Sequence, residues 1–343
     1  MSSKLVWSMQ RAEALQGLGA EWDALNRKRG ALPILDSQTV RLLLREFGDG
    51  SEQLAVCRCG EEVAAMTIVG SRGRGKWETF QPGQSPLGAW LHAPQHPLQP
   101  LLASLVRALP GACLLFGITQ QDPQLLARPE ADGRLRTLDY IETSRVSVVS
   151  SFAEYWQARG SNLRQNLKKQ RNRLARENVP TRLESIASPE EVGAAVDDFG
   201  RLESAGWKGG EGSAVHPENA QGRFYRGFFE RLSASGEATV YRYFFGDRLV
   251  ASDLCVHRNG TLIVLKTAFD ETEKTFSPSL LMKEQVFERL FGSGEVRCIE
   301  FYGKVMEWHR RWTDEMRTMY HVNYYRWPWI AKLQSRRKAH VPT

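Results

Sequence analysis

The sequence predicts an α/β fold built from two consecutive copies of one unit. Its length of 343 residues suits two packed domains. Residues 54–69 and 238–256 each read as strand, tight turn and strand, and each follows helical sequence, which indicates a faint internal repeat. Hydrophobic residues (42%) and charged residues (25%) occur in the proportions of a globular protein, which argues against extended disorder.

The predicted domains span residues 1–150 and 151–335, and a basic tail follows at 336–343. The boundary precedes a segment, 162–176, that is rich in helix formers. Leu163, Leu167 and Leu174 fall on one face of this predicted helix, and its arginines and lysines lie elsewhere. We therefore expect a basic amphipathic helix to open the second domain.

The second domain continues with clear turn and helix signals. The Asn259-Gly260 dipeptide between apolar runs predicts a hairpin. Ser277 suits the N-cap of a helix, Pro278 suits its first turn, and Gly292 suits its C-terminal end. A strand that leads into a helix start presents backbone N–H groups and the positive end of the helix dipole to an anion. Residues 276–281 are thus a candidate phosphate site, with a plain helix start as the alternative.

The charge balance favours an anionic partner. The net charge is +7 and the isoelectric point is about 9.2, which suits a nucleotide cofactor, nucleic acid or a phospholipid surface. Nucleic acid is the weakest of these, because the chain has no zinc-finger spacing or RNP-like motif.

The sequence also predicts a cytoplasmic location. Five cysteines without a CxxC pair fit reduced thiols. The apolar runs fall well below the roughly 20 residues of a membrane span, and the first residues lack a signal-peptide pattern. The aromatic residues between 308 and 329, followed by Arg336, Arg337 and Lys338, leave peripheral contact with the inner face of an anionic membrane as an alternative, although core packing explains most of them.

Five segments, in this order, resemble the second half of the GNAT-related acyltransferases of the CelD/BcsL family: RGSNLRQNLKKQRNRL, ESAGWKGGEGSA, FGDRLVASDLCV, LKTAFDETEKTFSPSLLM and EFYGKVMEWHRRW. The resemblance covers roughly residues 150 to 330, and the tandem layout extends it more weakly toward the N-terminus. It implies tandem GNAT-like domains with mixed, mainly antiparallel sheets, splayed so that acyl-CoA pairs with a strand edge. The first domain would be a degenerate copy that shapes the acceptor cleft, and the second would be catalytic.

The resemblance also implies a function: transfer of an acetyl or longer acyl group from acyl-CoA to an amine, without a metal, in polysaccharide, cell-envelope or lipid biosynthesis. The acceptor would be a small-molecule, lipid or sugar amine. The tandem layout also resembles the FemABX peptidyltransferases, which use aminoacyl-tRNA in place of CoA. A non-catalytic accessory protein of envelope biosynthesis is a further alternative.

Carried onto this sequence, the resemblance implies an acyl-CoA site in two parts. The strand part consists of Leu265, Lys266, Thr267 and Ala268, and the part that replaces the glycine-rich pyrophosphate loop consists of Ser277, Pro278, Ser279 and Leu280. Family sequences commonly have SPG where this chain has SPS. Ser279 therefore departs from the pattern at a point where phosphate would approach the backbone.

Attack of a neutral amine on a thioester requires a base and a polarised carbonyl but no covalent nucleophile. Glu203 is the predicted base, because it stands in a polar cluster with Trp207 and Lys208, which we expect to hold the acceptor. The alternatives are a surface glutamate at a helix end, a tryptophan in the core and a solvated lysine. Arg164 and Lys168 of the basic helix are predicted to bind a phosphate group of the acceptor or of CoA, or an anionic membrane, unless they form only a solvated face.

Four further positions complete the predicted acceptor side, and the first of them, Asp253, is a catalytic candidate. Asp253 interrupts an apolar strand, where a buried carboxylate needs a partner, and Lys266 on the next strand is the candidate. Strand alternation exposing both residues is the alternative. Tyr302, a further catalytic candidate, is followed by Lys304 and Trp308, for which a plain loop is the alternative.

Overall fold

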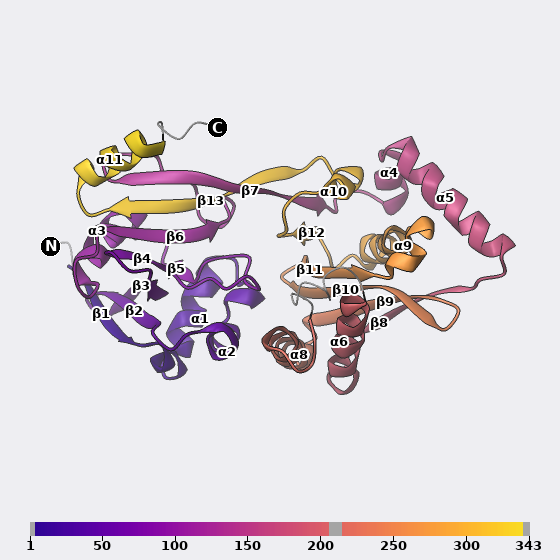
Figure 1. Ribbon diagram of the computed structural model, residues 1–343, viewed down its shortest axis with the longest axis horizontal. Helices are drawn as coiled ribbons and strands as arrows, with labels where there is room; N and C mark the ends of the chain where they lie inside the picture. Colours follow the sequence, from indigo (N-terminus) through magenta and orange to yellow (C-terminus); the bar gives the residue numbers. More distant parts are fainter. Residues whose placement is uncertain (1–3, 206–214, 339–343) are drawn as a thin grey trace. The chain divides into compact units, whose positions relative to one another are not determined.

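The computed structural model describes residues 4–205 and 215–338. The chain divides into two compact units: unit 1 comprises Met1–Glu142 and Arg317–Thr343, and unit 2 comprises Thr143–Met316 (Figure 1). Residues 317–335, predicted above as part of the second domain, thus belong to the first unit. The reason is that strand β13 (Met316–Tyr325) pairs antiparallel with β6 (Leu115–Gln121).

Unit 1 has a sheet in the order β1-β2-β3-β4-β6-β13, continued by β7, while β5 pairs with β3. The β4–β6 pair is parallel, and β1–β2, β2–β3, β3–β4 and β6–β13 are antiparallel. Its other elements up to β7 are β1 (Leu5–Arg11), η1 (Ala12–Gln16), α1 (Gly19–Lys28), η2 (Pro33–Leu35), α2 (Ser37–Phe47), β2 (Gln53–Cys59), β3 (Glu62–Ser71), β4 (Lys76–Thr79), β5 (Trp90–His92), α3 (Leu98–Ala108) and β7 (Leu135–Ser147). Helix α11 (Pro328–Lys338) follows β13.

The chain passes from unit 1 into unit 2 within β7. Unit 2 has a sheet in the order β7-β12-β11-β10-β9-β8, in which β11–β12 is the one parallel pair among the described strands (Figure 1). Its elements are α4 (Phe152–Gln157), α5 (Ser161–Arg176), β8 (Thr181–Ile186), α6 (Pro189–Ser204), α8 (Ala220–Ser233), β9 (Ala238–Phe245), β10 (Arg248–Arg258), β11 (Thr261–Phe269), η3 (Glu271–Phe276), α9 (Pro278–Ser293), β12 (Cys298–Phe301) and α10 (Glu307–Trp312).

The two units repeat one strand arrangement. The order β2-β3-β4-β6 in unit 1 matches β9-β10-β11-β12 in unit 2, because each series ends in a parallel pair whose strands are connected through a helix, α3 or α9. The repeat seen in the sequence corresponds to the hairpins β2–β3 and β9–β10. The predicted α/β fold with mixed, mainly antiparallel sheets is confirmed.

Several local predictions are also confirmed in unit 2. Asn259 and Gly260 have φ values of 52° and 76° and connect β10 with β11, as a tight hairpin turn requires. In α5 the three leucines of the apolar face are buried, and Lys168 and Lys169 are exposed. The apolar faces of α5 and α9 share a core with strands β9 to β12.

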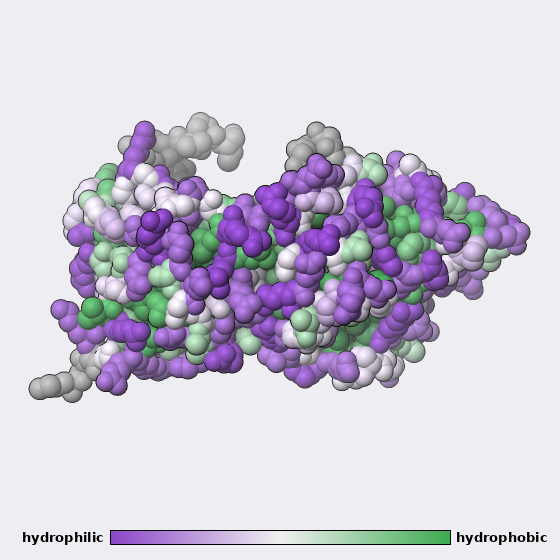
Figure 2. Space-filling model, turned by 90° about the horizontal axis from the view of Figure 1, so that it is seen from below, coloured by the Kyte–Doolittle hydropathy of each residue, from purple (hydrophilic) through white to green (hydrophobic). Residues whose placement is uncertain are grey.

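One face of the molecule is mainly polar (Figure 2). On the face shown in Figure 2, hydrophilic residues cover most of the area, and hydrophobic residues form separate small patches. None of the helices in the described ranges, 4–205 and 215–338, combines the length and apolar character needed to cross a membrane.

Candidate active site

The sheet of unit 2 opens beside β11. Strand β12 pairs with β11 only from Thr261 to Ile263, although β11 continues to Phe269. On its other side β11 pairs with β10 along its whole length, with a bulge at Leu265 where the register shifts. The edge of β11 that faces β12 is therefore not covered by that strand beyond Ile263.

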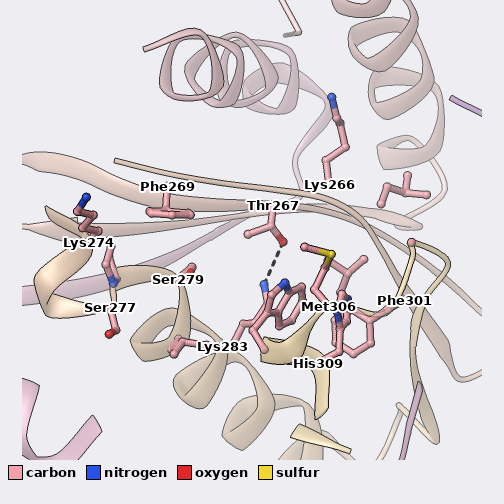
Figure 3. Close-up of a pocket in the computed structure, with 16 residues that line it drawn as sticks. Lys266, Thr267, Phe269, Lys274, Ser277, Ser279, Lys283, Phe301, Met306 and His309 are labelled. Atoms are coloured by element: carbon pink, nitrogen blue, oxygen red, sulfur yellow. Dashed lines mark hydrogen bonds between the residues drawn. The ribbon is translucent and has the colours of Figure 1, made fainter. Parts of the chain in front are cut away.

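A cavity of about 520 Å³ lies along this edge, within the size range of small-molecule sites (Figure 3). Its walls come from β11, the start of α9, the end of β12 and the region of α10, and about half of the lining residues have apolar side chains. The lining residues are Val264, Leu265, Lys266, Thr267, Phe269, Lys274, Ser277, Pro278, Ser279, Leu280, Lys283, Phe301, Gly303, Met306, Trp308 and His309. Seven of the eight predicted cofactor-binding residues are among them, and Ala268 is the exception.

The start of α9 forms one end of the cavity wall. Ser277 occupies the N-cap position, as predicted, but its backbone is left-handed (φ 56°, ψ 51°) and its side chain makes no capping hydrogen bond. Its carbonyl accepts the Leu280 and Leu281 N–H groups at 3.0 and 3.1 Å, and its hydroxyl accepts Asn166 Nδ2 of α5 at 3.4 Å. The Ser279 N–H belongs to the first helical turn, whose donors have no carbonyl of the same helix to reach. Lys274 adds a positive charge to the same wall.

A buried ion pair lies behind the cavity. Lys283 of α9 donates to both carboxylate oxygens of Asp253, at 3.0 and 2.7 Å. It also donates to Thr267 Oγ1 at 3.0 Å (Figure 3). Lys283 and Asp253 are only 1% and 2% exposed. Both predictions for Asp253, a pair with Lys266 and an exposed position, are therefore wrong. The register aligns Asp253 with Thr267 and Leu254 with Lys266, so side-chain alternation directs Lys266 to the opposite face of the sheet.

On that opposite face Lys266 meets Glu203. In Figure 3 the Lys266 side chain points away from Thr267 and Lys283. Its Nζ donates to Glu203 Oε2 at 3.0 Å and lies 5.4 Å from the Tyr225 ring centre. Glu203 also accepts the Val215 N–H at 2.8 Å and is 5% exposed, so the alternative of a surface glutamate is wrong. Burial, with a smaller contribution from the Glu203 charge, raises the pKa of Tyr225.

His309 is a cavity residue that the sequence analysis does not single out. Its Nδ1 accepts the Met306 N–H at 2.9 Å, and its ring stacks on Trp308 with centroids 3.6 Å apart. Burial, reinforced by the Lys283 ammonium, lowers the pKa of His309 to about 4, so the ring is neutral at pH 7. With Nδ1 acting as acceptor, the single ring proton resides on Nε2, which makes His309 a hydrogen-bond donor.

Lys283 is the second residue that the sequence analysis does not single out, and here the sequence carries a signal. Lys283 falls between Leu280 and Phe287 on the apolar stripe of α9, where a lysine requires a buried partner. His309 has no comparable signal, because its hydrogen bond to Met306 depends on how the chain enters α10.

Of the remaining predicted residues that the structure describes, only Trp308 lines the cavity. Tyr302 is half-buried directly after β12, and Lys304 is exposed. In α5, Arg164 donates to the Arg159 carbonyl at 3.2 Å and Lys168 is exposed. Trp207 and Lys208 lie outside the described residues. Within those residues, no three His, Cys, Asp or Glu side chains group as a metal site would require.

The corresponding opening in unit 1 is filled by the chain itself. After β4, the Phe80 N–H donates to the Ile68 carbonyl at 2.8 Å, and the Gly88 N–H donates to the Thr119 carbonyl of β6 at 3.3 Å. A Cβ on Gly88 would lie 2.5 Å from that carbonyl oxygen, so only glycine fits there. Trp90 of β5 is then completely buried. Residues 80–92 thus occupy the place where unit 2 has its cavity.

Comparison with known proteins agrees with this geometry. Residues 161–310 match the family model described as acetyltransferase (GNAT) domain. No curated protein matches the chain. Among solved structures, the chain is similar to the C-terminal domain of a putative lysylphosphatidylglycerol synthetase from Agrobacterium fabrum, with 15% identity, 92% of this chain and 94% of that chain covered, and a TM-score of 0.56.

The chain is also similar to FemX, with 10% identity, 92% of this chain and 98% of that chain covered, and a TM-score of 0.57. A third similar structure is a conserved protein of unknown function from Bacteroides thetaiotaomicron, with 10% identity, coverage of 94% and 100%, and a TM-score of 0.54. At these identities the matches show the fold alone. The predicted GNAT fold is confirmed, while membership of the CelD/BcsL family stays a prediction.

Proposed function

We propose that the protein is an acyltransferase that uses the unit 2 cavity to transfer an acyl group from acyl-CoA to an amine. The observation that supports this most is the meeting of an uncovered strand edge with a helix start in one cavity. Acyl-CoA has both features that such a cavity accommodates: a pantetheine arm with two amides and a pyrophosphate.

The donor would lie on the α9 side of the sheet. The pantetheine amides would pair with the backbone of β11 between Leu265 and Ala268, where β12 no longer pairs. The pyrophosphate would accept the Ser279 N–H at the start of α9, with Lys274 close by. Asn166 ties α5 to Ser277, and Lys169, three residues later, projects from the same side of α5. The basic helix would therefore contribute charge toward a phosphate group of CoA.

The acceptor would approach from the other face of β11. Glu203 lies on that face, near the C-terminus of α6, and would take the proton from the attacking amine directly or through a water. Lys266 holds the Glu203 carboxylate from the same strand whose backbone lines the donor cavity. Glu203 is thus tied to the strand along which we place the thioester.

Two buried groups would assist the chemistry in different ways. His309, neutral and carrying its proton on Nε2, would donate to the thioester carbonyl oxygen as negative charge develops there. Asp253 is held by the Lys283 ammonium on both oxygens, so we assign it to positioning β10 against α9 and not to proton transfer. The electron pair of the amine forms the new amide bond, and the CoA thiolate leaves.

The test is calorimetric titration of the full chain with acetyl-CoA and with longer acyl-CoAs. We expect one site per chain, because unit 1 has its opening filled. Ser279→Glu should weaken binding at least about tenfold by repelling the pyrophosphate. Ser293→Glu puts the same charge near the other end of α9 and should leave affinity nearly unchanged.

The same titration decides between the two donors that the sequence analysis leaves open. An aminoacyl-tRNA donor predicts tRNA binding that falls steeply with salt and no measurable CoA binding. That outcome would overturn the proposal, and so would a CoA affinity that Ser279→Glu leaves unchanged. CoA binding with neither acyl transfer nor thiol release on any amine would favour the non-catalytic alternative.

A further inference from the structure

Trp327 and the helix that follows it, α11, carry an apolar surface that is partly exposed among the described residues. Trp327, Trp329 and Leu333 are 41%, 57% and 51% exposed. They are three of the eight exposed large hydrophobic side chains in the described ranges, and they fall within seven residues of sequence. The two indole rings are stacked, with centroids 6.1 Å apart. Such clustering, unlike single exposed apolar residues, indicates an interaction surface.

Helix α11 is attached to unit 1 by its other side. Ala331 is buried, Ile330 is partly buried, and both pack with Leu115 of β6 and Tyr325 of β13. Because these contacts hold the helix to the sheet, Trp327, Trp329 and Leu333 are left outside the core. These three exposed side chains therefore belong to a segment that is packed on the sheet, and not to a chain end without contacts.

The same stretch is strongly basic. Residues 326–338 include Arg326, Lys332, Arg336, Arg337 and Lys338, and the chain contains no aspartate or glutamate after Glu315. A partner must therefore accept tryptophan side chains and many positive charges together. The surface of an anionic bilayer does both, because indole rings partition to the headgroup level and basic residues meet the negative lipid charge.

The other basic helix, α5, lacks the apolar half of this combination. Its exposed Lys168 and Lys169 supply charge, but Leu163, Leu167 and Leu174 are buried in the unit 2 core. Helix α5 thus has no leucine stripe to insert into lipid. This contrast separates the two basic surfaces of the chain and makes α5 the matched control.

We propose that residues 326–338 dock unit 1 on an anionic phospholipid surface, with Trp327, Trp329 and Leu333 at the headgroup level. The inference stands apart from the proposed acyl transfer, since it uses no residue of the unit 2 cavity. The helix lies on the bilayer and does not cross it, in keeping with its eleven residues.

The experiment is co-sedimentation of the full chain with vesicles of phosphatidylcholine, with and without phosphatidylglycerol. We expect binding only when phosphatidylglycerol is present. The triple variant Arg336→Gln, Arg337→Gln and Lys338→Gln should weaken this binding about 100-fold, since each basic residue near the surface contributes roughly fivefold. Trp327→Ser with Trp329→Ser should weaken binding at least about tenfold while all basic residues remain.

The control variant is Lys168→Ala with Lys169→Ala, which we expect to bind the same vesicles within about twofold of wild type. Thermal unfolding of each variant shows whether it is folded. The proposal is overturned if the variants at residues 327–338 bind the vesicles like wild type, or if only the α5 variant loses vesicle binding. It is also overturned if the wild-type chain does not bind phosphatidylglycerol vesicles. If the chain binds tRNA through residues 326–338 and does not bind vesicles, the partner of this surface is a nucleic acid and not a lipid.

Discussion

Replacing His309 with alanine removes one hydrogen-bond donor from the wall of the unit 2 cavity. Because the Met306 N–H occupies Nδ1, only Nε2–H is available to a ligand. One preorganised donor at a developing oxyanion lowers the barrier by about 3 kcal/mol, which corresponds to roughly 100-fold in kcat. We therefore expect His309→Ala to lower kcat about 100-fold and to change acyl-CoA affinity little, because the effect belongs to the transition state.

The assay is single-turnover release of CoA thiol with acetyl-CoA and the best acceptor from a panel of amines. His309→Gln provides the control, because its amide N–H₂ reaches close to the position of Nε2–H and should restore part of the rate. His309→Asn is shorter, places its amide nearer Nδ1 and should restore none. Equal rates in the alanine and glutamine variants, or a wild-type rate in His309→Ala, would refute the role of the donor.

Three other predictions concern buried titratable groups. Glu203→Gln should lower turnover roughly 10²- to 10⁴-fold at neutral pH and leave CoA affinity nearly intact. The loss of turnover should become smaller as pH rises, because more of the acceptor amine is then neutral, and pH-rate profiles measure this. Wild-type turnover in this variant would remove Glu203 from the mechanism. Lys283→Met leaves the Asp253 charge buried and should cost about 3–5 kcal/mol in urea unfolding, whereas Lys283→Met with Asp253→Leu should recover most of it; equal losses would contradict the pairing. The pKa of His309 is about 4 in the folded chain and near 6.5 when unfolded, so the unfolded chain binds the proton first. His309 by itself therefore lowers stability by about 3 kcal/mol as pH drops from 6.5 to 4. His309→Phe should lose less stability over that window than wild type does.

Local chemistry in the sequence was sufficient for several elements of the fold. Asn259-Gly260 predicts the hairpin turn because both residues tolerate the positive φ that such a turn requires. Pro278 predicts the first turn of α9, since proline there loses no hydrogen bond and already has a helical φ. The leucine spacing predicts the buried face of α5. The candidate donor site follows from the same kind of signal, a strand and a helix start that are close in sequence.

Contacts between distant segments were decided only by the tertiary structure. The bulge at Leu265 and the β10–β11 register determine that Asp253 meets Lys283 while Lys266 meets Glu203 across the sheet. The return of β13 to unit 1 depends on pairing with β6, about 200 residues earlier in the chain. The neutral state of His309 depends on burial and on Lys283. Sequence patterns report what one segment requires of its surroundings, but side-chain partners and pKa values are set by which segments the sheet brings together.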